Sequence, residues 1–143
     1  MKNLIFLFLT ALSSCTATQK NEQYLRVDFA SICCGTPSEK PLLDHVKKFK
    51  KEEKLKNVDI WRESGLGREG EFALFISLDG FKKSQQAELI NGIKLLTENF
   101  NKKRNNNSDG YINISEELIS KIDLMKKKEK KTNTFYNFEQ IKY

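Results

Sequence analysis

The stretch that decides the fold reads Val-Asp-Ile-Trp-Arg-Glu over residues 58–63, Ser-Gly-Leu-Gly-Arg-Glu-Gly over 64–70 and Glu-Phe-Ala-Leu-Phe-Ile-Ser-Leu over 71–78. Apolar residues alternate along the first and last parts, which is typical of β-strands, and three glycines lie between them. We therefore predict a β-hairpin with a long loop. Alternate side chains of a strand point to the same side, so one face of this hairpin is apolar. That face comprises Val58, Ile60, Phe72, Leu74, Ile76 and Leu78.

The hairpin loop also contains the pattern Gly65-x-Gly67-x-x-Gly70, which is found in dinucleotide-binding loops. In those sites the glycines lie between a strand and a helix, and the helix N-terminus binds the pyrophosphate. Here a strand is predicted to follow. A protein-kinase glycine-rich loop does lie in a hairpin, but it needs a lysine on the next strand, and residues 72–78 contain none. We interpret the glycines as residues that supply positive φ angles, and we predict no cofactor.

The first 14 residues have the order of an export signal. Lys2 is followed by an apolar run that is too short to span a bilayer, and then by small residues. This order predicts a signal peptide over residues 1–14.

The residues Leu12-Ser13-Ser14-Cys15 resemble the lipobox of bacterial lipoproteins, in which an aliphatic residue and two small residues precede a cysteine. The resemblance implies cleavage before Cys15, acylation of that cysteine and a stable anchor, because more than one acyl chain is expected. Residues 15–23 are then a polar tether. Thr16, where an aspartate would favour the inner membrane, implies the outer membrane, and we expect its periplasmic side rather than the cell surface. The alternatives are an ordinary secretory signal or an uncleaved signal anchor.

The remaining residues 24–143 are enough for a single domain with its own core. We expect a first strand over 24–34, a helix that opens with a capping box from Thr36 to Glu39, and a second helix after the hairpin, capped by Ser84 and ending within 101–110. The apolar stripes of the two helices comprise Leu42, Val46 and Phe49, and Leu89, Ile93, Leu96 and Phe100.

The order strand, helix, strand, strand, helix predicts an α+β fold of the ferredoxin-like split βαβ type, an antiparallel sheet with two helices on one face. Residues 111–114 then read as a short strand. Ser115 is expected to cap an extra C-terminal helix, whose apolar stripe comprises Leu118, Ile122 and Met125. The aromatic segment 134–143 supplies either the fourth strand of the sheet or an edge strand, and the sequence leaves both alternatives open.

The second face of the predicted sheet is charged and aromatic. It comprises Arg26, Asp28, Asp59, Trp61, Glu63, Glu71, Ala73 and Phe75. Either this face is open to a ligand or a protein, or the C-terminal aromatic residues Phe135, Tyr136 and Phe138 cover it. Asp28 and Glu63 are carboxylates that a hydrolase could pair, but nothing in their spacing requires such a pair.

Since no catalytic set is complete, our leading hypothesis is a non-enzymatic, lipid-anchored protein of the cell envelope. Its candidate partner-binding residues lie on the second face and in the hairpin loop, and they are Trp61, Arg62, Leu66, Arg68 and Glu69. Without the signal peptide the chain has 24 basic and 19 acidic residues, a formal charge of +5. The partner is an envelope protein or an anionic envelope component. Nucleic acid is a poor partner for an exported protein.

The alternative function is a thiol- or metal-dependent one at Cys33 and Cys34, with His45 as a third metal ligand. These cysteines lie between a strand and a helix N-terminus, where thiols are activated. Neighbouring Cα atoms lie about 3.8 Å apart, short of the roughly 4.4–6.8 Å that disulfides prefer, so a bond between them would be strained. No second cysteine pair exists to complete a metal site, so we expect no metal. The simpler interpretation buries at least one of the cysteines as a small apolar residue.

Overall fold

The computed structural model describes residues 22–129 and 136–142. The predicted signal peptide, the lipobox with Cys15, most of the tether and Phe135 lie outside these residues. In the described part the protein has an α+β fold with three helices and a six-stranded antiparallel sheet. The elements are β1 (Gln23–Ala30), α1 (Lys40–Glu52), β2 (Ile60–Ser64), β3 (Phe72–Ser77), α2 (Lys83–Lys103), β4 (Tyr111–Ile114), β5 (Ile119–Ser120), α3 (Lys121–Glu129) and β6 (Asn137–Gln140).

The strands lie in the order β4-β1-β3-β2-β6, and β5 pairs with β1 beyond the end of β4. The predicted hairpin is confirmed, because β2 pairs with β3 from Ile60 opposite Ile76 to Ser64 opposite Phe72. The choice between the two C-terminal segments is also decided. β4 pairs with β1, whereas β6 pairs with β2 and forms the far edge of the sheet.

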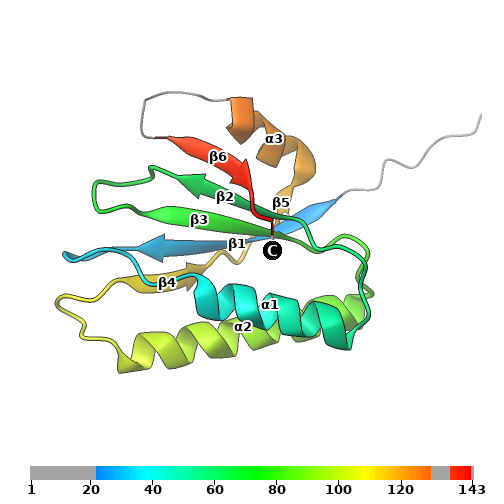
Figure 1. Ribbon diagram of the computed structural model, residues 1–143, viewed down its shortest axis with the longest axis horizontal. Coiled ribbons are helices and arrows are strands. Elements are labelled where there is room, and N and C mark those ends of the chain that lie inside the picture. The colour runs from blue at the N-terminus through cyan, green and yellow to red at the C-terminus, as the bar shows by residue number, and fades with distance from the viewer. Residues whose placement is uncertain (1–21, 130–135, 143) are drawn as a thin grey trace, which may run out of the picture.

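Helices α1 and α2 cover one face of the sheet, the lower one in Figure 1. The apolar stripes predicted for them are buried there at Leu42, Val46, Phe49, Leu89 and Ile93, whereas Leu96 and Phe100 are half-buried. The apolar residues of β1, β2 and β3 complete this core. They comprise Leu25, Val27, Phe29, Ile60, Phe72, Leu74 and Ile76. The alternating apolar residues of the strands thus pack against the apolar stripes of α1 and α2 in one layer.

The predicted helix starts were wrong. Helix α1 begins at Lys40, with Glu39 at its N-cap and a proline in its first turn. A start at Thr36 would place Pro41 in the helix interior, where it has no N–H to donate and clashes with the preceding turn. Helix α2 begins one residue before Ser84, and the Gln85 side chain accepts a hydrogen bond of 2.8 Å from the Lys82 N–H.

Helix α3 begins at Lys121 rather than after Ser115, because Ile119 and Ser120 first pair with β1. The Ser120 hydroxyl accepts a hydrogen bond of 3.2 Å from the Asp123 N–H, as an N-cap residue does. The predicted stripe was also wrong, since Leu124 is the buried residue of this helix.

Helix α3 lies over the second face of the sheet, above it in Figure 1, and β6 extends the sheet beside β2. A second apolar cluster forms between α3 and this face. It comprises Tyr24, Ala73, Phe75 and Leu124, with Trp61, Ile119, Met125 and Phe138 packed against it. Of the two alternatives for this face, the C-terminal cover is therefore the one that the protein adopts, through α3 and Phe138.

Candidate binding surface

The predicted partner-binding residues Trp61 and Arg62 do not share a surface, because adjacent residues of a strand point to opposite faces. Trp61 lies on the second face, where its ring stacks on Phe138 with the ring centres 5.4 Å apart. Arg62 lies on the side of the helices, 2.6 Å from a Glu39 carboxylate oxygen and 4.0 Å above the ring of Phe72. Both side chains make contacts within the fold, and the five predicted residues do not form one continuous surface.

The hairpin loop carries the other three predicted residues, Leu66, Arg68 and Glu69, which are exposed. Glu71 holds this loop in shape. Its carbonyl accepts the Leu66 N–H at 3.1 Å, and its carboxylate accepts the Glu69 N–H at 2.9 Å.

Two of the three loop glycines supply the predicted positive φ angles, and Gly67 does not. Gly65 and Gly70 have φ angles of 79° and 85°, which side chains rarely permit. A Cβ atom at Gly67 would collide with the Glu71 carboxylate. Strand β3 follows the loop, so no helix N-terminus faces the glycines.

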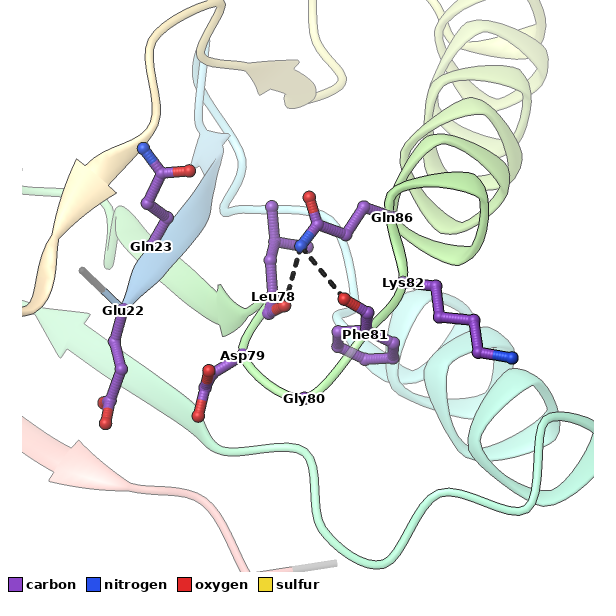
Figure 2. A pocket seen from close by; sticks show the side chains of 8 residues that line it. All are labelled: Glu22, Gln23, Leu78, Asp79, Gly80, Phe81, Lys82 and Gln86. Carbon is purple, nitrogen blue, oxygen red and sulfur yellow. Dashed lines mark hydrogen bonds between the residues drawn. The ribbon is translucent and has the colours of Figure 1, made fainter. Parts of the chain in front are cut away.

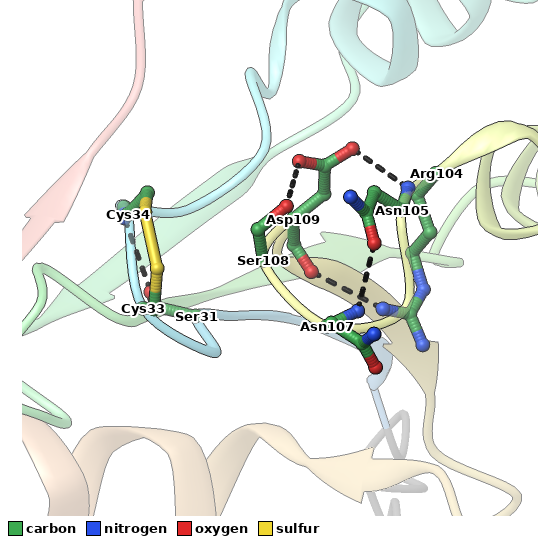
Figure 3. Close-up of a disulfide and its surroundings, with 9 residues drawn as sticks. Ser31, Cys33, Cys34, Arg104, Asn105, Asn107, Ser108 and Asp109 are labelled. Carbon is green, nitrogen blue, oxygen red and sulfur yellow. Dashed lines mark hydrogen bonds between the residues drawn. A yellow bond between two sulfur atoms is a disulfide. The ribbon is translucent and has the colours of Figure 1, made fainter.

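Cys33 and Cys34 lie in the loop between β1 and α1, where both are exposed. Their sulfur atoms form a disulfide, with the Cα atoms 3.8 Å apart (Figure 3). The expectation of a buried cysteine was therefore wrong. In the same loop the Ser31 hydroxyl accepts the Gly35 N–H at 3.1 Å.

The loop between α2 and β4 lies beside the disulfide loop (Figure 3). A Cβ atom at Gly110 would lie 2.9 Å from the Gly35 carbonyl oxygen, so only glycine permits this approach of the two backbones. Asp109 accepts the Asn105 N–H at 2.8 Å and the Ser108 hydroxyl at 3.0 Å. These hydrogen bonds lower the pKa of Asp109, and the one from the Asn105 backbone has the larger effect.

The three loops lie at one end of the sheet, on the left in Figure 1, and β1 begins at the other end. The strand register agrees, because Ala30 lies opposite Tyr111 and Phe29 lies opposite Phe72. Three large apolar side chains are exposed at this end, Ile32 at 43 %, Leu66 at 41 % and Tyr111 at 38 %.

We call this end the distal loop surface, comprising Ile32, Cys33, Cys34, Leu66, Arg68, Glu69 and Tyr111. Ile32 and Tyr111 were not singled out from the sequence. The available signal was that each is a large apolar residue next to a predicted turn.

The second face contains a buried carboxylate, Glu63, which is 4 % exposed. Lys127 Nζ lies 3.1 Å from both of its oxygens, and the Tyr136 hydroxyl donates to it at 3.0 Å. The pKa of Tyr136 is raised to about 12, mainly because its hydroxyl is buried and secondly because it donates to the charged Glu63. Arg26 Nη2 lies 2.7 Å from Asp28 Oδ1. Asp28 and Glu63 both lie opposite Ala73 of β3, so two strand spacings, about 9.6 Å, separate their backbones. Each carboxylate therefore has its own cation.

A hollow of about 340 Å³ lies at the end of the sheet opposite the distal loop surface (Figure 2). Its lining residues are Glu22, Gln23, Leu78, Asp79, Gly80, Phe81, Lys82 and Gln86. Gln86 Nε2 lies 3.1 Å from the Leu78 carbonyl oxygen and 3.4 Å from that of Phe81, so this amide closes the turn between β3 and α2.

Residues 22–129 and 136–142 contain no group of three or more His, Cys, Asp and Glu side chains arranged to hold a metal ion. His45 instead packs against Gly92 of α2. None of the helices in these same ranges is both long and apolar enough to cross a membrane.

Comparison with known protein families, curated proteins and solved structures finds no match.

Proposed function

We propose that this is a lipid-anchored protein of the cell envelope, on the periplasmic side of the outer membrane, that binds a protein partner without catalysing a reaction. The binding site is the distal loop surface. The observation that carries the proposal is that Ile32, Leu66 and Tyr111, from three separate segments, are exposed at the end of the sheet opposite Glu22. Acyl chains on Cys15 would enter from the Glu22 side, so the distal loop surface would face away from the membrane.

Two properties of this surface support a protein as the partner. Its loops are braced by their own hydrogen bonds through Glu71 and Asp109, so little ordering is needed on binding. It also combines apolar, aromatic and arginine side chains, the types enriched in protein interfaces. The Arg104 guanidinium lies 5.5 Å from the centre of the Tyr111 ring. Arg68 is next to Glu69, so the hairpin tip has no excess of charge that would favour an anionic polymer.

The test places a photo-crosslinking amino acid at Leu66 in the full chain, within its native envelope. The matched control is the same amino acid at Leu95, which is 61 % exposed on α2. We expect a discrete protein adduct from position 66 and none from position 95. A second substitution, Ile32→Asp, should lower the yield about tenfold, since a lost apolar contact is worth about 1.4 kcal/mol or more. Equal adducts from both positions, or a yield that Ile32→Asp leaves unchanged, would contradict the proposed site.

We further propose that the fold is a ferredoxin-like split βαβ unit with additions. The elements β1 to β4 with α1 and α2, and the strand order β4-β1-β3-β2, support this proposal. Strand β5, helix α3 and strand β6 are then the additions. The two strands extend the sheet, and α3 covers its second face.

A second candidate function is thiol–disulfide exchange at Cys33 and Cys34, which the exposure of both residues favours. Reduction would break the sulfur–sulfur bond and transfer two electrons and two protons from a dithiol, which itself becomes a disulfide. Alkylation of intact cells before lysis, followed by mass measurement, tests this function. A fraction of chains alkylated at both cysteines is expected for a redox cycle. Complete protection of the pair under all growth conditions would contradict it.

A further inference from the structure

A cluster of lysines surrounds Leu55 where α1 ends. They line a shallow hollow of about 450 Å³ together with that leucine. The lysines are Lys47, Lys50, Lys51, Lys54 and Lys56. All but the half-buried Lys50 are exposed, and Leu55 is half-buried. The hollow thus has a charged rim and an apolar floor.

Three of the five lysines, Lys51, Lys54 and Lys56, have no acidic partner within residues 22–129 and 136–142. Nearby acidic groups are already engaged, since Glu52 pairs with Lys48 at 3.8 Å and Glu53 accepts a hydrogen bond of 2.6 Å from Gln85. Among the residues that the structure describes, Lys51, Lys54 and Lys56 form no ion pair. Three ammonium groups are therefore available to an external anion.

Stabilisation of the helix explains only part of this cluster. Lysines in the last turn of a helix interact favourably with its negative C-terminal end, which accounts for Lys50 and Lys51. Lys54 and Lys56 lie beyond the last helical residue, Glu52. Lys54 has a φ angle of 52°, a left-handed conformation that lysine rarely adopts. Folding alone does not require lysine at either position.

The hollow lies at the end of the molecule next to the predicted membrane anchor, and this position indicates which anion it binds. Helix α1 ends at the same end of the molecule at which β1 begins, on the right in Figure 1. Residues 15–21 span at most about 25 Å when fully extended, so the end of the molecule at which β1 begins stays close to any membrane that holds Cys15. At the opposite end, the disulfide and hairpin loops contain no lysine, and Lys102, Lys103 and Arg104 lie where α2 ends.

We infer that the lysine hollow binds the anionic headgroups of the membrane in which the protein is anchored. The inference rests on the proposed acylation of Cys15. The ammonium groups of Lys51, Lys54 and Lys56 contact lipid phosphates, and Leu55 lies against the headgroup region. This contact holds α1 against the membrane and directs the distal loop surface away from it. The anchor alone would leave the domain free to turn on its tether.

The test is lysine acetylation of the acylated full-length mature protein in vesicles, read by mass spectrometry. One set of vesicles contains phosphatidylcholine alone, and the other contains 30 % phosphatidylglycerol, a fraction chosen to be about that of an anionic membrane. We expect labelling of Lys51, Lys54 and Lys56 to fall about fivefold in the anionic vesicles. It should recover in about 1 M salt, where the Debye length is about 3 Å.

Lys102 and Lys103 are the matched internal control, because they lie in the last turn of α2 at the opposite end of the protein. Their labelling should be the same in both vesicles. In the variant Lys51→Gln/Lys54→Gln/Lys56→Gln, protection of the neighbouring Lys47 should be lost, whereas Lys102→Gln/Lys103→Gln should preserve it. Equal labelling of the hollow in both vesicles, or an equal loss at Lys102 and Lys103, would overturn the inference.

Intact mass separates this result from a failure of the proposed function. A mature chain that starts at Cys15 and carries acyl mass, but whose lysines are labelled equally, contradicts only the lipid contact. A chain without acyl mass contradicts the anchor itself, and the inference with it.

Discussion

At the residue scale, the single histidine of the chain lies between the two helices that cover the sheet. A Cβ atom at Gly92 would collide with the His45 ring, and His45 Nε2 is buried without a hydrogen-bond partner among the described residues. Burial first, and then the charge of Lys48, lowers the pKa of His45 from 6.5. The folded protein therefore favours the neutral imidazole.

Stability should consequently fall as the pH drops below about 6.5, because the unfolded chain then binds a proton that the folded chain resists. The full contribution of His45 is present above pH 6.5 and is lost towards its lower folded pKa. Urea unfolding at pH 7.5 and 5.5 measures the loss. Since no other histidine titrates in this range, His45→Leu should lose clearly less stability between the two pH values. An identical loss in both proteins would show that His45 is not the group responsible.

At the element scale, the C-terminal segment decides what the second face of the sheet can do. Phe138 of β6 stacks on Trp61 and lies 6.1 Å from the centre of the Phe75 ring. Lys127 of α3 and Tyr136 satisfy the buried carboxylate of Glu63. These contacts join residues more than sixty positions apart, and they convert a predicted binding face into a second core.

The variant Phe138→Ala should destabilise the fold by about 2 kcal/mol, less than for a fully buried phenylalanine because Phe138 is half-buried. The emission of Trp61, the single tryptophan, should shift to longer wavelength as water reaches its ring. Thermal unfolding and fluorescence measure both effects. Glu139→Ala, an exposed neighbour on the same strand, is the control and should change neither. Unchanged Trp61 emission in Phe138→Ala would mean that Phe138 does not shield the Trp61 ring in solution.

At the scale of the whole molecule, the two ends of the sheet have different characters. The lysine hollow lies at the end of the molecule at which β1 begins, and the distal loop surface with the disulfide lies at the other end. The two proposed contacts therefore lie at opposite ends of the protein. The lipid contact belongs to the end next to the tether, and the protein contact to the end that points away from it. A change at one end should therefore leave binding at the other intact.

The sequence by itself determined the central hairpin, the apolar stripes of α1 and α2 and the use of glycine in the hairpin loop. These follow from alternation, helical spacing and backbone freedom, which neighbouring residues set locally. The sequence also predicts the signal peptide and lipobox, which lie outside the described residues. The starts of the helices could not be predicted as well. Pro41 overrode the capping signal of Thr36, and the pairing of Ile119 with β1 overrode that of Ser115.

Only the tertiary structure decided which surfaces remain exposed. Trp61 was expected in a binding site, yet Phe138, which is 77 positions further along the chain, covers it. At least one of the two cysteines was expected to be buried, yet both are exposed. Ile32, Leu66 and Tyr111 lie at the same end of the sheet only because β1, β3 and β4 pair in this register. Exposure depends on contacts between distant segments, and the local pattern of a sequence does not encode which distant segment will pack against a given face.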